Sequence, residues 1–209
     1  MNRFIWGCLP GMVLAVTALA QSTEMAPDAL ARKVTEEVVA VIRSDKDLQA
    51  GNTRKILNLV ETKVLPHFNF THMTRLAVGA PWRQATSAQQ QRLTNEFRTL
   101  LVHTYTNAFS QYQDQVIEYK PLKLQPAETD VLVRSVVKQS GGGDPIDINY
   151  RMEKTDAGWK VYDVAIGGVS LVQNYRSSFN TEIQKSGIDG LIAALASKNK
   201  SLDPQSVAK

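Results

Sequence analysis

The sequence predicts an α+β domain in which a four-stranded antiparallel sheet is covered by helices from both ends of the chain. Three observations lead to this fold class. Apolar residues recur at helical spacing over residues 28–45 and 87–112, whereas they alternate with a period of two over residues 115–167. The glycine-containing turns between the alternating segments are short, which favours antiparallel hairpins. Helical spacing returns over residues 171–195, so helices flank the sheet in the chain and are expected to pack on one of its faces.

The start of the chain has the form of a secretory signal peptide. Arg3 is the only charged residue among the first 20, an apolar run follows it, and Ala18–Ala20 has the small-x-small pattern of a cleavage site. Cys8 is the only cysteine and lies in this segment, so we expect no disulfide and no thiol chemistry in the mature protein. The predicted organisation is a signal peptide over 1–20, one domain over 21–199 and a polar tail over 200–209.

Two helices are expected first. Pro27 lies near the start of a helix over residues 28–45, and Asn52 or Thr53 can cap a second helix that Pro66 ends. The segment after it is a short mixture of polar and apolar residues to which no element is assigned.

The clearest helix is predicted over residues 87–112. Thr86 or Ser87 can serve as its N-cap, and its apolar residues recur at i, i+3, i+4 and i+7. The resulting stripe consists of Leu93, Phe97, Leu100, Leu101, Thr104, Tyr105, Ala108, Phe109 and Tyr112.

Four strands are expected next, because the period changes to two. The third alternates most clearly, with apolar residues on one face and Asp147, Asn149, Arg151 and Glu153 on the other. A glycine triplet and a turn at Asp156–Gly158 connect these strands as hairpins. The predicted strands cover residues 115–124, 129–139, 146–154 and 159–167.

Two helices are expected to close the domain. Ser170 follows a glycine pair and is placed to cap the first of them. That helix is expected to stop near Gly187, and the second carries Leu191, Ile192 and Leu195.

The residues that could support catalysis or metal binding are few. No cysteine or acidic pair stands at metal-ligand spacing from His67 or His72, so no metal and no cofactor are predicted. Ser170 lacks the second glycine of a nucleophile elbow. An enzyme such as an isomerase or hydrolase, with Asp147, Asp163 or His103 as its base, is kept as an alternative. A third possibility is an envelope adaptor protein with a filled core.

Apolar surface is the remaining signal. One predicted sheet face must be covered, and the helix over 87–112 is the natural cover. Patterning alone does not distinguish a filled core from a pocket for an apolar ligand. The face carries Val131, Val133, Ile148, Tyr150, Met152, Tyr162, Val164 and Ile166, and the covering helix contributes Leu100, Leu101, Tyr105 and Phe109.

The chain resembles the MlaC family of periplasmic phospholipid-binding proteins, also called the toluene-tolerance auxiliary family. The resemblance spans nearly the whole mature chain. Two residues depart from the family pattern. The family often has Asp where this chain has Asn69, and an acidic residue where it has Gly167. It rests on the segments Val64–Phe70, Gly79 with Trp82–Thr86 and Gln89, Phe97 with Leu100, Leu101, Thr104 and Tyr105, Trp159–Asp163, Gly168–Val172, Asn174–Phe179 and Gly187–Leu191.

The resemblance implies a soluble, monomeric and non-enzymatic phospholipid carrier of the periplasm. Such proteins hold acyl chains inside and move lipid between an outer-membrane lipoprotein complex and an inner-membrane ABC transporter complex, which maintains outer-membrane lipid asymmetry. The face and helix named above become the expected pocket wall, with Val169 and Val172 near its mouth and Gly167 and Gly168 as a candidate hinge. The net charge of +4 is spread over scattered basic residues, which favours approach to anionic headgroups and not nucleic acid.

Overall fold

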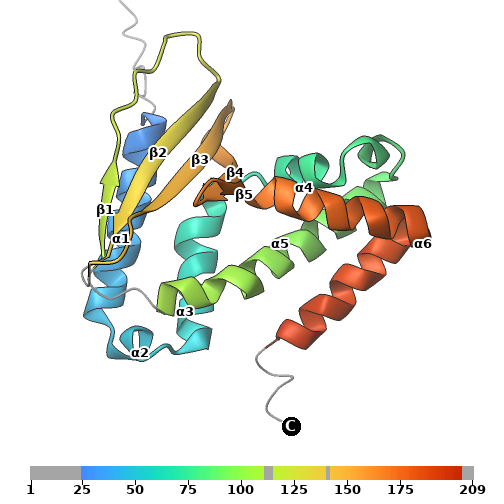
Figure 1. The fold of residues 1–209 in the computed structure, drawn as a ribbon, viewed down its shortest axis with the longest axis horizontal. Coiled ribbons are helices and arrows are strands. Elements are labelled where there is room, and N and C mark those ends of the chain that lie inside the picture. The colour runs from blue at the N-terminus through green and yellow to red at the C-terminus, as the bar shows by residue number, and fades with distance from the viewer. Residues whose placement is uncertain (1–24, 111–114, 140–141, 204–209) are drawn as a thin grey trace, which may run out of the picture.

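The computed structural model describes residues 25–110, 115–139 and 142–203, with side chains to residue 106 in the first of these ranges. The elements are α1 (Pro27–Ser44), α2 (Lys46–Gln49), α3 (Thr53–Leu59), α4 (Phe70–Val78), α5 (Ser87–Ser110), β1 (Val116–Tyr119), β2 (Asp130–Lys138), β3 (Ile146–Thr155), β4 (Gly158–Ile166), β5 (Val169–Ser170) and α6 (Leu171–Leu202). An antiparallel sheet and the helices α1, α2 and α3 form one half of the molecule, and the helices α4, α5 and α6 extend from it (Figure 1).

The predicted fold class is confirmed, with one strand more than expected. The described sheet has the order β1-β2-β3-β4-β5, and all neighbouring strands are antiparallel. The fifth strand is the short segment that follows β4 through Gly167 and Gly168. Both glycines have positive φ, 56° and 83°, as a two-residue turn of the primed type requires. The turn therefore accounts for the glycine pair, and the role of Gly167 and Gly168 as a hinge stays a prediction.

The polar residues expected at helix starts make the predicted caps. Asn52 accepts from the N–H of Lys55 at 3.2 Å, and Ser170 accepts from the N–H of Gln173 at 3.1 Å. Thr86 forms a reciprocal capping box with Gln89, whose backbone N–H reaches the threonine hydroxyl while its side chain accepts from the Thr86 N–H.

Two helical elements were not expected from the sequence. α2 is a single turn whose first N–H groups bond to the carboxylate of Asp45. α4 begins where Asn69 accepts from the N–H of His72 at 3.0 Å. Both are too short for apolar periodicity to identify them. The second predicted helix also runs on past α3, through a π-helical turn (Val60–Val64) and a 3-10 turn (Leu65–His67) that contains Pro66.

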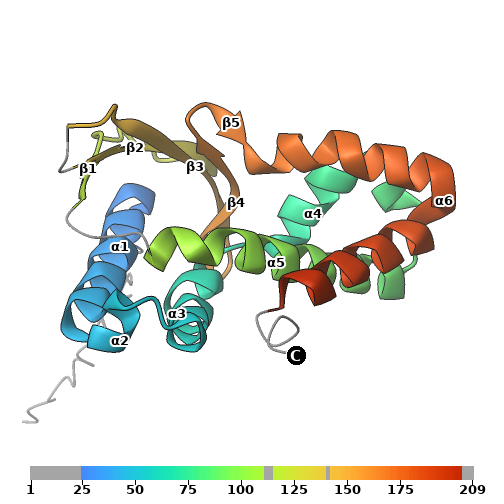
Figure 2. The same ribbon diagram turned by 60° about the horizontal axis from the view of Figure 1, so that its bottom comes forward.

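The two predicted closing helices are the two halves of α6. Gly187 separates them, with φ 71° and ψ −174°, a backbone conformation that is essentially restricted to glycine. The helix turns back at this residue (Figures 1 and 2). Its second half continues through Leu202, so the first residues of the predicted polar tail are helical. The predicted signal peptide lies outside the described residues.

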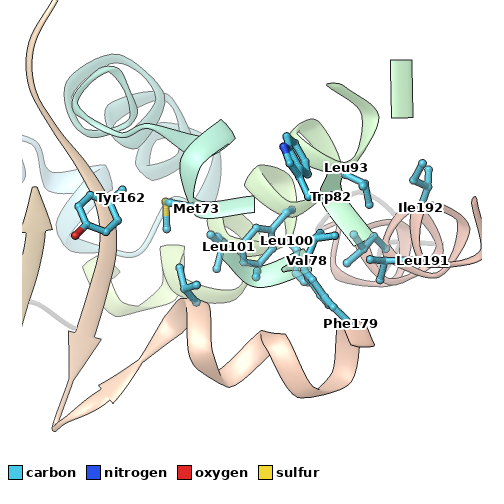
Figure 3. Close-up of a cluster of buried hydrophobic side chains, with 14 residues drawn as sticks. Met73, Val78, Trp82, Leu93, Leu100, Leu101, Tyr162, Phe179, Leu191 and Ile192 are labelled. Carbon is cyan, nitrogen blue, oxygen red and sulfur yellow. The ribbon is translucent and has the colours of Figure 1, made fainter. Parts of the chain in front are cut away.

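The apolar side chains form three clusters. One lies between α1, α2 and α3 and includes Val38, Ile42 and Ile56. A second joins α4, α5 and α6, as Figure 3 shows. The third lies on one face of the sheet, which curves over α1 (Figure 2). The molecule thus has separate apolar layers on the two sides of β4.

Replacing Gly187 with alanine tests whether the reversal of α6 depends on this backbone conformation. No atom lies within 4 Å of a Cβ built at Gly187, so the cost arises from backbone strain and not from a clash. We expect Gly187→Ala to lower the free energy of unfolding by about 1–3 kcal/mol, measured by urea denaturation. Gln184→Ala, at an exposed position one turn earlier, should leave it nearly unchanged. A Gly187→Ala protein as stable as the parent would contradict this assignment.

Candidate functional site

Most residues of the predicted pocket wall share one face of the sheet. The strand register aligns Met152 with Val131 on one side, and Tyr150 with Val133 and Val164 on its two sides. Ile148 faces Ile166, which in turn pairs with Val169 of β5. The prediction that these side chains lie together is confirmed. The shared face, named the lipid-face cluster after the role that the sequence predicts for it, consists of Val131, Val133, Ile148, Tyr150, Met152, Val164, Ile166 and Val169.

The exposure of this cluster increases along the strands. Met152 and Val133 are each 1% exposed, whereas Val169 is 58% exposed. Ile148 and Ile166 lie between these extremes and are partly buried. One end of the lipid-face cluster is therefore closed by protein, and the other end presents aliphatic side chains to the surroundings.

The cover of this face is not the one expected. Leu30 and Ala31 of α1 and Phe68, just before α4, pack against the lipid-face cluster. Leu100, Leu101 and Tyr105 of α5 belong instead to the cluster between α4, α5 and α6. The side chain of Phe109 lies outside the described part of the chain.

The physical reason is that α6 and α4 occupy the apolar stripe of α5. The Phe97 ring contacts Tyr175 and Phe179 edge-on, with centroid distances of 5.1 Å in both pairs. Burial, and after it the neighbouring Tyr175, raises the pKa of Tyr105. Sequence periodicity shows that a stripe is buried but not which element buries it.

Tyr162 and Val172 are also placed differently from the prediction. A register shift between Arg151 and Met152 turns Tyr162 to the opposite face from Val164, because a bulge reverses the alternation of side chains. Tyr162 there donates to Asp130 at 2.6 Å. Val172 is 1% exposed and packs among the helices, so it does not lie at a mouth.

Hydroxyl groups interrupt the apolar character of the lipid face near β1. The Tyr119 hydroxyl is 2.6 Å from that of Thr35 and donates to the carbonyl of Ala31 at 3.1 Å. Tyr150 interacts with Tyr119 and Ser135, and its burial among apolar side chains raises its pKa well above the ordinary tyrosine value. Both tyrosines therefore stay neutral hydrogen-bonding groups at physiological pH.

A polar contact that the sequence did not reveal holds α4 to the sheet. Glu153 of β3 accepts from the side-chain amide of Asn69 at 2.7 Å and lies 2.9 Å from Nδ1 of His72. The His72 ring stacks on Tyr162 with a centroid distance of 4.4 Å. Asn69 also caps α4, and its N–H bonds to the carbonyl of Val161 at 2.8 Å. Asn69 and Glu153 are 84 positions apart, so only the tertiary fold brings them together.

The three side chains considered as a catalytic base have different surroundings. Asp163 accepts from the Ser170 hydroxyl at 2.6 Å and from the Val172 N–H at 3.2 Å, so it helps to cap α6. Asp147 is exposed, and Nδ1 of His103 is buried without a hydrogen-bond partner. No group of His, Cys, Asp and Glu among the described residues could hold a metal ion. Across the described ranges, no helix is both long enough and apolar enough to span a membrane.

Comparisons with known proteins agree with the fold and with the resemblance found in the sequence. The family model described as MlaC protein matches residues 32–197. The intermembrane phospholipid transport system binding protein MlaC of Haemophilus influenzae is 22% identical over 189 residues, which cover 90% of this chain and 87% of that protein. Toluene tolerance protein ttg2D of Pseudomonas putida is 22% identical over 199 residues, covering 92% of each.

A solved structure is similar over most of the chain. It is the phospholipid-binding protein of Ralstonia solanacearum in complex with a phospholipid, with a TM-score of 0.79 and 37% sequence identity. The match covers 85% of this chain and 99% of that one.

The contact made by Glu153 predicts a measurable stability effect. Glu153→Ala removes the acceptor for Asn69 and His72, and we expect it to lower the free energy of unfolding by about 2 kcal/mol. Glu153→Gln can still bond to both partners and should lose less. Asp144→Ala removes the same charge at an exposed position and serves as the control. Equal urea midpoints for Glu153→Ala and Asp144→Ala would show that the contact does not hold α4 to the sheet.

Proposed function

Because the chain belongs to the MlaC protein family, we propose that it is a non-enzymatic phospholipid carrier. The acyl chains lie against the lipid-face cluster, and the headgroup faces water. The phospholipid bound in the Ralstonia solanacearum protein, 37% identical to this chain, supports this assignment. The structural observation that supports this proposal is the aliphatic sheet face. It is covered at Met152, which is 1% exposed, and open at Val169, which is 58% exposed.

A carrier needs partners because binding energy alone gives lipid transfer no direction. Burying about 30 methylene groups from water would contribute more than ~20 kcal/mol at ~0.8 kcal/mol each, beyond the practical limit of non-covalent affinity. Lipid that leaves a bilayer exchanges one apolar environment for another, so the net free energy is small. The partners we propose are an outer-membrane lipoprotein complex, which delivers or accepts lipid, and an inner-membrane ABC transporter complex. The signal-peptide pattern of residues 1–20 supports a periplasmic location.

The alternatives are weaker for specific reasons. The carboxylate of Asp163 accepts hydrogen bonds from Ser170 and from the start of α6, so it is committed to a structural role. An adaptor with a filled core does not account for an aliphatic sheet face that becomes exposed toward β5.

Lipid extraction tests the function directly. We expect purified protein, extracted with organic solvent and analysed by mass spectrometry, to yield phospholipid, and lipid-free protein to take up phospholipid from vesicles. Protein that contains none and takes up none would overturn the proposal.

A charge on the lipid face should prevent loading, because an unpaired carboxylate in an apolar site is strongly unfavourable. Ile148→Asp is the test variant, since Ile148 is partly buried on this face. Val136→Asp is the matched control, because Val136 pairs with Asp147 on the opposite face of the sheet. We expect lipid uptake from vesicles to be lost in the first variant and kept in the second, with both folded by circular dichroism. If a folded Ile148→Asp protein takes up lipid normally, Ile148 does not line the pocket.

A further inference from the structure

A surface cleft of about 210 Å³ lies between α1 and β1, outside the lipid-face cluster. Four of the five α1 residues that line it, Arg32, Glu36, Val39 and Arg43, are spaced by four, three and four positions, and Thr35 lies three positions after Arg32. This spacing places them on one side of the helix. The complete lining is Arg32, Thr35, Glu36, Val39, Arg43, Gln115, Val116, Ile117 and Tyr119.

The cleft combines cationic and apolar groups. Arg32 and Arg43 are exposed, whereas Val39 and Ile117 are partly buried. Neither guanidinium forms an ion pair with a carboxylate in the described part of the chain. Glu36 is also exposed in the lining, so the charged side chains of the cleft sum to +1. Guanidinium groups above an apolar floor suit a ligand with one anionic group and an attached apolar part.

Tyr119 connects this cleft to the lipid face. Its ring packs against the lipid-face cluster and also lines the cleft. The guanidinium carbon of Arg32 lies 5.1 Å from the ring centroid, in a cation–π contact. Beyond Tyr119 come the hydroxyls of Tyr150 and Ser135 and then the aliphatic side chains of β2 and β3. From the cleft inward, the order is therefore cationic groups, then hydroxyl groups, then hydrocarbon.

A phospholipid has the same order of chemical groups: phosphate, glycerol esters and acyl chains. We propose that the α1–β1 cleft binds the phosphate of the carried lipid through Arg32 and Arg43, an inference that rests on the proposed function. Tyr119 forms the boundary between phosphate and acyl chains. Glu36 weakens the attraction for an anion, which suits a carrier that must release its cargo.

The test compares two lipids that differ only in the phosphate. Lipid-free full-chain protein is titrated with vesicles containing palmitoyl-oleoyl phosphatidic acid or palmitoyl-oleoyl diacylglycerol, and the bound lipid is quantified by mass spectrometry. The variant Arg32→Gln/Arg43→Gln should bind the phospholipid about fivefold more weakly, as expected for exposed charge pairs, with diacylglycerol binding unchanged. Arg54→Gln/Arg92→Gln, which removes two exposed arginines outside the cleft, should change neither. Glu36→Gln should bind the phospholipid more tightly than the parent.

Each other outcome overturns the proposal in a distinguishable way. Equal phospholipid binding by the parent and the cleft variant would show that the cleft does not hold the headgroup, while leaving the carrier function intact. A parent protein that binds neither lipid would reject the carrier function itself. In the remaining experiment, the protein is titrated with inorganic phosphate, and binding is measured by NMR of the arginine side chains. Saturable binding of inorganic phosphate, with phospholipid binding unaffected by the substitutions, would identify a site for free phosphate in place of a headgroup site.

Discussion

The architecture depends on a single constraint, which is that β4 must be covered on both of its faces. Val161 and Val164 point to the lipid face, while Tyr162 and Asp163 point to the other side. The register shift opposite Arg151 and Met152 makes this division possible, because a bulge places two neighbouring side chains on the same face. The strand then joins two apolar layers that otherwise share few residues. Tyr162 packs among the helices, and Asp163 caps the helix that follows.

The two layers have different packing, and this difference agrees with a carrier function. The helical layer is closed by aromatic contacts around Phe97, which is 0% exposed. The lipid face is closed only at the Met152 end. Glu153 fixes α4 to the sheet beside that closed end, through Asn69 and His72. The tightly packed helical layer can therefore support the sheet, while the more open apolar face is the one proposed to exchange the lipid.

Reversible binding sets a limit on how strongly any one group can hold the lipid. In the proposed function, the apolar face would exchange hydrocarbon with a membrane at little net free energy, and polar contacts at the headgroup would then contribute most to selectivity. Exposed arginines contribute modestly because water screens them. The carboxylate of Glu36, which lies in the same cleft, reduces the attraction further. Such a balance permits capture from one membrane and release to another.

The sequence by itself determined the types of the longer elements, most helix caps, the two halves of α6 and the alternation that places Ile148, Tyr150 and Met152 on one face. These features follow from local spacing and capping chemistry, which depend only on residues that are close in the sequence. The tertiary structure alone decided which element covers which face. Leu100, Leu101 and Tyr105 pack against α6 and α4 because helices far along the chain return to them. Tyr162 changed face because it is the extra residue of a bulge in β4, and Glu153 met Asn69 across 84 positions. Alternation shows that a side chain is buried, but its partner depends on contacts between distant segments, which no local pattern encodes.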